Sequence, residues 1–316
     1  APHMSSFHTP VMLKECLLYL EPRDGGVYVD ATLGGGGHSL AMLEARPQAK
    51  LYCFDQDEEA IEAAAQNLAQ HCGQVDLIRA NFSGIRTELA LRQIKTIDGA
   101  LFDLGVSSHQ LDCPERGFSF DNDAPLDMRM DGTQKMTAAK AVQELDQATL
   151  AKIFKEYGEE LNAGRIARAI VTSREESPIV STGDLARVIE KVAGTGSKES
   201  LKTKVRVFQA LRIYVNGELD VLRAALLDTI NILKPGARIV VLSYHSLEDR
   251  IVKNALRDMS QECQCPSRVL GCNCGKKKLV KILTKSPLVA DEAEVRTNKR
   301  SRSAKLRAAE RILGES

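Results

Sequence analysis

The sequence predicts an α/β fold in which a parallel, Rossmann-like sheet is interrupted by an inserted domain made of helices. Five short apolar segments have the character of buried strands, and helix-like stretches with βαβ spacing join the first four. More than 130 residues separate the fourth segment from the fifth, far more than an ordinary crossover needs. Within that interval apolar residues recur at three- and four-residue steps, which indicates helices.

The predicted elements follow one another in a simple order. The strands are Val27–Thr32, Lys50–Asp55, Val75–Asn81, Ile97–Leu104 and Ala237–Tyr244, and Glu58–Gln70 is one of the joining helices. The insert holds helices at Thr149–Tyr157, Asn162–Arg174, Thr182–Val192 and Thr203–Tyr214, the third after a start signal at Ser181. A helix over Glu218–Leu233 leads back to the sheet. We therefore predict a discontinuous sheet domain of residues 5–108 and 217–316 and a helical domain of residues 109–216.

Bulk composition is that of a soluble globular protein, with 43% hydrophobic and 27% charged residues in a chain of 316. No apolar run approaches the ~20 residues that span a bilayer, and the amino terminus lacks the pattern of a signal peptide. We expect a cytoplasmic protein without a membrane partner. The oligomeric state is left open, with a homodimer as one alternative.

The net charge of +1 hides a basic segment late in the chain. Residues 276–307 hold eleven Lys or Arg against three Asp or Glu, a local charge of +8, so the remainder sums to −7. Such a segment could bind a polyanion such as RNA, or it could be an ordinary solvated surface. Charge alone leaves both alternatives open.

The eight cysteines do not predict disulfides in a cytosolic context. Four of them lie within twelve residues of one another: Cys263, Cys265, Cys272 and Cys274. Such a cluster favours a metal, and structural zinc is one interpretation, although the CxC spacing is shorter than the usual zinc spacing. Four free thiols in a basic loop are the alternative.

A glycine-rich turn follows the first predicted strand. The strand ends in Asp30, four consecutive glycines occupy 34–37, and a helix-like segment follows. The second strand ends in Asp55, eighteen residues after Gly37. Glycines allow positive φ and let a ligand lie against the backbone, while an acid at the next strand end can accept ribose hydroxyls. The segment therefore predicts a site for an adenosine-type cofactor.

Charge at this turn distinguishes two classes of cofactor. A carboxylate at Asp30 would repel the pyrophosphate of a dinucleotide but could bind the ammonium of a methionine moiety. Asp30 serves either to orient the turn or to bind that end of the cofactor. Phe82 follows the third strand as an apolar wall for adenine, and Asp103 ends the fourth strand. These features favour S-adenosylmethionine (SAM), with a NAD oxidoreductase as the alternative.

Longer motifs carry a closer resemblance over nearly the whole chain. DATLGGGGHS, FDLGVSSHQLD, ERGFSF with PLDMRMD, YGEE, VRVFQALRIYVNGEL, SYHSLEDR and NKRSRSAKLRAAERI occur in this order. Together they resemble the bacterial ribosomal RNA small-subunit methyltransferase H family. The resemblance implies a class I SAM-dependent methyltransferase that methylates N4 of a cytosine in the decoding region of 16S rRNA, with the helical insert recognising the substrate. A non-catalytic ribosome-assembly factor that retains the fold is the alternative.

The resemblance also implies a set of cofactor contacts. They are Gly36, Gly37, His38, Asp55, Phe82, Asp103 and Gln110. The strand ends and the glycine turn independently indicate the glycines, Asp55, Phe82 and Asp103, whereas Gln110 is implied by the resemblance alone. For Asp55 the competing interpretation is a cap on the following helix. The sequence departs from the family pattern at Tyr244, where Phe is usual, and at His109, where Pro is common.

The catalytic groups are less clear because the chain lacks the Asp/Asn-Pro-Pro-aromatic run of many amino-methyltransferases. By position, Asp103 at the end of the fourth strand and Ser243 and His245 at the end of the fifth are the candidates. His245 could accept the proton lost after methyl transfer, or it could be a structural histidine bonded in a turn. Ser246 to Asp249 resembles a capping box, so Ser246 is expected to start a helix.

Basic and aromatic residues are the candidates for contact with 16S rRNA or with the small ribosomal subunit, because the target base must be splayed out of folded RNA. Arg116, Phe118 and Phe120 are expected to clamp or stack the base. Lys202, Lys204, Arg206 and Arg212 recur along one predicted helix and could follow phosphates. The segment 296–307, with Arg300 and Arg302, is the first choice for contact with the RNA backbone.

Overall fold

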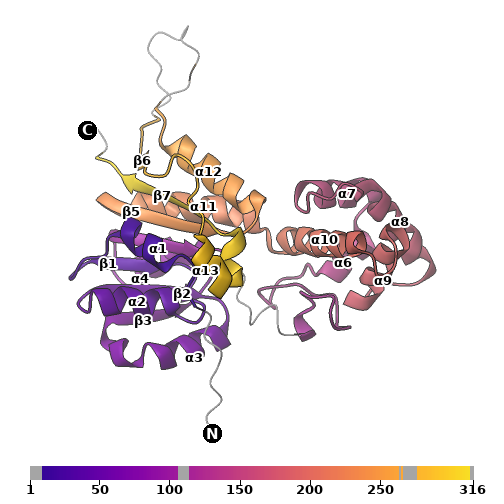
Figure 1. Cartoon of the computed structure of the whole chain (residues 1–316), viewed down its shortest axis with the longest axis horizontal. Helices are drawn as coiled ribbons and strands as arrows, with labels where there is room; N and C mark the ends of the chain where they lie inside the picture. Colours follow the sequence, from indigo (N-terminus) through magenta and orange to yellow (C-terminus); the bar gives the residue numbers. More distant parts are fainter. Residues whose placement is uncertain (1–8, 106–113, 263–264, 266–275, 314–316) are drawn as a thin grey trace. The chain divides into compact units, whose positions relative to one another are not determined.

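The computed structural model describes residues 9–105, 114–262, 265 and 276–313 (Figure 1). The chain divides into two compact units, one of residues 1–105 and 219–316 and the other of residues 106–218. The first unit holds the sheet, and the second is built of helices. That the helical unit recognises the substrate stays a prediction.

The sheet has seven strands in the order β3-β2-β1-β4-β5-β7-β6. The strands are β1 (Val27–Asp30), β2 (Lys50–Asp55), β3 (Val75–Arg79), β4 (Ile97–Asp103), β5 (Leu233–Ser243), β6 (Val280–Ile282) and β7 (Lys305–Arg311). The first five are parallel, and β7 runs antiparallel to both β5 and β6. The predicted Rossmann-like sheet and its five parallel strands are confirmed, but β6 and the antiparallel β7 were not predicted.

Helices cover both faces of this sheet. Buried residues of β4 and β5 alternate: Phe102 and Val241 belong to the core beneath α4, α11 and α12, whereas Leu101 and Leu242 belong to the core beneath α1, α2 and α3. Burial on both faces explains why these strands are continuous apolar runs. The helices are α1 (Leu13–Leu20), α2 (Gly37–Ala45), α3 (Glu58–Asn67), α4 (Ile85–Leu91), α11 (Glu218–Ile232) and α12 (Ser246–Met259).

The basic segment late in the chain is mostly ordered structure rather than a free tail. Its described part contains α13 (Glu292–Thr297), the 3₁₀ helix η4 (Lys299–Ser303) and β7. Arg307 lies inside β7, is only 8% exposed, and forms a two-pronged ion pair with Asp249 of α12, with Nε–Oδ1 at 2.7 Å and Nη2–Oδ2 at 3.0 Å. The expectation that Arg307 contacts RNA is therefore wrong, because pairing of β7 with β5 buries its side chain.

The helical unit has its own apolar core. Its helices among the described residues are α6 (Ala138–Glu144), α7 (Gln147–Glu156), α8 (Ala163–Glu176), α9 (Thr182–Ala193) and α10 (Lys198–Asn216). Besides η4, the described residues form the 3₁₀ helices η1 (Ala69–Gln74) and η2 (Phe82–Gly84) in the sheet unit and η3 (Pro114–Arg116) in the helical unit. The predicted start at Ser181 is confirmed as a capping box with Asp184. Among the helices of the described residues, none has both the length and the apolar content that crossing a membrane requires.

We predict that Arg307→Ala destabilises the sheet unit by about 3–5 kcal/mol, because it leaves the Asp249 carboxylate buried without its partner. Arg302→Ala is the matched control, since Arg302 is an exposed arginine of the same basic segment and its loss should change stability by less than about 0.5 kcal/mol. The midpoints of thermal and urea unfolding measure both effects. Equal midpoints for the two variants would show that the ion pair contributes nothing.

Candidate active site

Three acidic residues end three adjacent parallel strands. Asp30 ends β1, Asp55 ends β2 and Asp103 ends β4, and β1 lies between the other two strands. Open α/β sheets bind their ligands at this carboxyl edge. Burial is the largest cause that raises the pKa of Asp55, and the charges of Asp57 and Asp30 add to the rise. The edge is therefore a negatively charged candidate site.

The glycine turn connects this edge to α2. The backbone N–H of Gly34 donates to Asp55 Oδ2 (3.0 Å), and the N–H of Leu33 donates to the carbonyl of Phe54 (2.9 Å). Gly34 and Gly36 have φ of 51° and 82°, values that other residues rarely adopt. A Cβ at Gly37 would lie 2.6 Å from Pro10 Cγ. The turn thus needs glycine for backbone conformation at two positions and for packing at a third.

Asp30 is used inside the turn rather than presented to a ligand. It is 1% exposed, its Oδ2 accepts from Ser39 O–H (2.6 Å), and its Oδ1 accepts from Thr32 N–H (3.2 Å). Burial raises the pKa of Asp30, and the Ser39 hydrogen bond opposes that rise. Of the two roles considered for Asp30, the structure favours orientation of the turn.

Asp55 accepts two backbone hydrogen bonds and remains partly accessible. Its Oδ2 accepts from Gly34 and its Oδ1 accepts from Asp57 N–H (2.9 Å). Asp57, not Asp55, is the N-cap of α3, where its side chain accepts from Glu59 N–H (3.1 Å). The capping role considered for Asp55 is therefore wrong. Burial raises the pKa of Asp55, and the two backbone donors oppose the rise.

Phe82 and His38 flank the carboxylates. Phe82 begins η2 directly after β3, and its ring packs edge-on against Phe102 with centroids 5.7 Å apart. His38 is 8% exposed, and its Nε2 donates to the carbonyl of Val11 (3.0 Å) while Nδ1 lies 3.7 Å from Asp103 Oδ2. Phe82 is thus partly exposed, whereas His38 is buried. Their roles as cofactor contacts stay predictions.

Asp103 is held by three neighbouring groups. Its N–H donates to Thr32 Oγ1 (2.5 Å), and Oδ1 accepts from Tyr244 O–H (2.7 Å) and from Gly105 N–H (3.2 Å). Tyr244 had been noted in the sequence only as a departure from the family pattern, and its contact with Asp103 was missed. A strand-end tyrosine carries no sequence signal that distinguishes a hydrogen-bonding role from packing.

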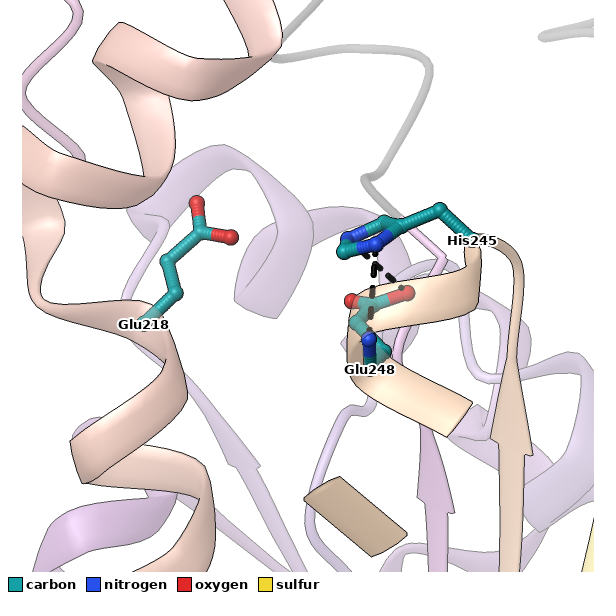
Figure 2. Close-up of side chains that lie close together, drawn as sticks. All are labelled: Glu218, His245 and Glu248. Carbon is teal, nitrogen blue, oxygen red and sulfur yellow. Dashed lines mark hydrogen bonds and ion pairs between the residues drawn. The ribbon is translucent and has the colours of Figure 1, made fainter. Parts of the chain in front are cut away.

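The end of β5 supplies the other two catalytic candidates. Ser243 is 2% exposed. His245 is the N-cap of α12: its Nδ1 accepts from Glu248 N–H (3.4 Å), and its Nε2 lies 3.3 Å from Glu248 Oε1 (Figure 2). The expected capping box starting at Ser246 is therefore wrong by one residue. A cap that accepts through Nδ1 has its lone pair directed at the helix, which favours the structural alternative for His245.

Comparison with known proteins shows the family of this chain. A model of the MraW methylase family matches residues 5–312. A ribosomal RNA small subunit methyltransferase H of Geotalea uraniireducens is 52% identical over 312 residues, which are 98% of this chain and 100% of that protein. The chain belongs to the MraW methylase family. Proteins of the same name from Geotalea daltonii and Carboxydothermus hydrogenoformans are 49% and 47% identical and cover 96% and 98% of this chain, or 98% and 99% of their own lengths.

Three of the cations expected to contact RNA have acidic neighbours in this member of the MraW methylase family. Lys204 forms an ion pair with Glu190 (2.5 Å), Arg206 lies 3.6 Å from Glu160, and Arg212 Nε lies 3.0 Å from Glu218 Oε1. Their contact with RNA phosphates stays a prediction.

The two phenylalanines and the remaining arginines that were expected to contact RNA differ in how deeply they are buried. Phe118 is buried in the core of the helical unit, and Phe120 packs against Phe208 with ring centroids 5.2 Å apart. Phe118 therefore cannot stack a base, a correction that follows from its burial. Arg116 ends η3 and is partly exposed, Arg300 is partly exposed in η4, and Arg302 is exposed.

Some predicted residues of this MraW-family chain lie outside the described ranges. Gln110, Cys263, Cys272 and Cys274 are among them. Cys265 is described and exposed. The interpretation of the cysteine cluster as structural zinc stays a prediction.

We predict that His245→Asn keeps the stability of α12, because asparagine is a strong N-cap, whereas His245→Ala lowers stability by about 1 kcal/mol. If capping is the main role, the asparagine variant also retains methyl transfer within about threefold, since asparagine restores the helix but cannot accept a proton at neutral pH. Thermal unfolding and a methyl-transfer assay measure both quantities. A fully folded His245→Asn variant without turnover would instead establish His245 as the proton acceptor.

Proposed function

We propose that this protein transfers a methyl group from SAM to the exocyclic N4 amine of a cytosine in the decoding region of 16S rRNA. The observation that carries the proposal is the row of carboxylates at the carboxyl edge of β2, β1 and β4. Family membership and the names of the relatives support the reaction class and the small-subunit rRNA substrate. The N4 position rests on the sequence resemblance.

The charge of this edge fits SAM better than a dinucleotide. Opposite charges attract and like charges repel with a strength that grows as water is excluded. A pyrophosphate at this edge would face the partly exposed carboxyl groups of Asp55 and Asp103, with Asp30 buried behind the turn. SAM instead carries a cationic sulfonium, an ammonium and no phosphate. The row of acids therefore disfavours the NAD alternative.

The strand order supports a proposed residue for each part of SAM. Phe82 follows β3 and offers an apolar surface for adenine, and Asp55 at the neighbouring β2 can accept from the ribose hydroxyls. The glycine turn after β1 and Asp103 at β4 come next in the sheet and suit the amino-acid end. Bound SAM would supply an already activated methyl group, so positioning is a large part of the task left to the protein.

The acceptor amine needs a hydrogen-bond acceptor beside it, because the cytosine ring delocalises the lone pair of N4. Asp103 is the candidate that best meets this need, since its carboxylate ends β4 and its side chain is 17% exposed. Ser243 is almost fully buried and would have to act from behind this group. The protein's own contribution is therefore to hold and orient the amine with a fixed carboxylate.

RNA contact is assigned to the exposed and partly exposed arginines that remain. Arg302 is exposed, and Arg300 and Arg116 are partly exposed. Arginine is well suited to phosphate because its planar guanidinium can donate two parallel hydrogen bonds. The substrate, whether free 16S rRNA or the assembled small subunit, and action in the cytoplasm belong to this proposal.

We predict that Asp55→Ala weakens SAM binding at least about tenfold, because each lost hydrogen bond to a charged group contributes about 1.5–3 kcal/mol. Asp98→Ala is the matched control: Asp98 lies near the start of β4, where it accepts from Val27 N–H (2.8 Å) and pairs with Lys234 (3.2 Å). Calorimetric titration measures both affinities. Unchanged affinity in Asp55→Ala would overturn the ribose assignment.

We predict that 16S rRNA from cells lacking this protein loses one methyl group at N4 of a decoding-region cytosine. Reintroducing the intact chain should restore the group, and reintroducing Asp103→Ala should not. Mass-spectrometric mapping of rRNA fragments detects the difference. A methylation pattern that is identical with and without the protein would contradict the proposed substrate.

A further inference from the structure

Tyr244 contacts Asp103 of the candidate reaction site through its hydroxyl. It follows the last residue of β5 directly, and its hydroxyl donates to Asp103 Oδ1 at 2.7 Å. The bond joins the ends of two adjacent parallel strands, because Asp103 pairs with Leu242 in the sheet. A direct hydrogen bond to a carboxylate is stronger than one between neutral groups.

The tyrosine is itself fixed at several points. Its ring packs against the core shared with α1, α2 and α3, and its backbone N–H donates to Glu248 Oε1 (3.2 Å) at the start of α12. Burial raises the pKa of Tyr244, and the adjacent Asp103 charge adds to the rise. The phenol therefore remains protonated and can serve only as a donor to the carboxylate.

The two oxygens of Asp103 are used unequally. Oδ1 accepts from both Tyr244 O–H and Gly105 N–H, whereas Oδ2 faces His38 Nδ1 at 3.7 Å, beyond hydrogen-bonding distance. With Oδ1 occupied, the carboxylate cannot rotate without losing both donors. Oδ2 accepts no hydrogen bond from the described residues and is thereby left as the oxygen available to a ligand.

Crowding around Gly105 keeps this arrangement tight. A Cβ at that position would lie 3.0 Å from the Tyr244 ring, 3.0 Å from Arg300 Nη2 and 3.2 Å from Asp103 Oδ1. A side chain at this position would require these groups to move apart by a few tenths of an ångström. Arg300, expected from the sequence to contact the RNA backbone, is thus next to Asp103 and Tyr244.

We propose that Tyr244 is a positioning residue that locks the Asp103 carboxylate with Oδ2 presented to the reacting groups. The inference rests on the assignment of Asp103 to the methyl-transfer site under the proposed function. It adds a residue that acts through Asp103 and need not touch cofactor or RNA. A residue that served only to fill the core would need the ring but not the hydroxyl.

Tyr244→Phe tests this directly because it removes the hydroxyl and keeps the ring. We expect SAM to bind about fivefold more weakly and single turnover at saturating SAM to slow about tenfold, as expected for one charge-assisted hydrogen bond, with KM for the RNA unchanged. Tyr28→Phe is the matched control, since Tyr28 is a buried tyrosine of β1 whose hydroxyl accepts from Arg23 N–H (2.8 Å). The control should leave both affinity and turnover at the wild-type level.

A double-mutant cycle separates action through Asp103 from a general effect. In an Asp103→Ala background, Tyr244→Phe should cause no further loss of SAM affinity. Wild-type turnover in Tyr244→Phe, an equal loss in Tyr28→Phe, or an additive loss in the cycle each overturns the inference. Failure of the wild-type chain itself to bind SAM would instead overturn the proposed function.

Discussion

The buried carboxylate of Asp30 is the interaction on which the site depends. It accepts from Ser39 in α2 and from Thr32 in the turn, and Thr32 in turn accepts from the N–H of Asp103. One side chain thus fixes the start of a helix, the glycine turn and the end of β4 relative to one another. A buried charge is costly unless it is hydrogen-bonded, so the sequence around it has little freedom.

At the carboxyl edge of the sheet, Asp55 and Asp103 remain available for a ligand. Asp30 is used by the protein, whereas Asp55 and Asp103 each accept two hydrogen bonds and still keep partly exposed side chains. Their spacing follows from the sheet, because β2, β1 and β4 are adjacent. Parallel pairing therefore brings together carboxylates that lie far apart in the sequence, and the rigid sheet keeps them in place.

The parts of the fold with strong local patterns could be predicted from the sequence, and the parts that depend on tertiary pairing could not. The glycine turn could be predicted from its composition, and the apolar strands from their hydrophobic pattern. β7 could not be predicted, because its Lys and Arg residues do not give the apolar pattern of a buried strand. The charge of Arg307 is compensated by Asp249, which lies 58 residues away in the sequence. The N-cap of α12 was likewise predicted one residue too late, at Ser246, whereas the structure has His245 in that position.

The claim that the acidic edge selects SAM over a dinucleotide is tested most directly by calorimetric titration of the intact protein with SAM and with NAD. The account predicts saturable binding of SAM and no detectable heat with NAD, because pyrophosphate would face the carboxylates of Asp55 and Asp103. Binding of NAD in competition with SAM, or of NAD alone, would contradict it.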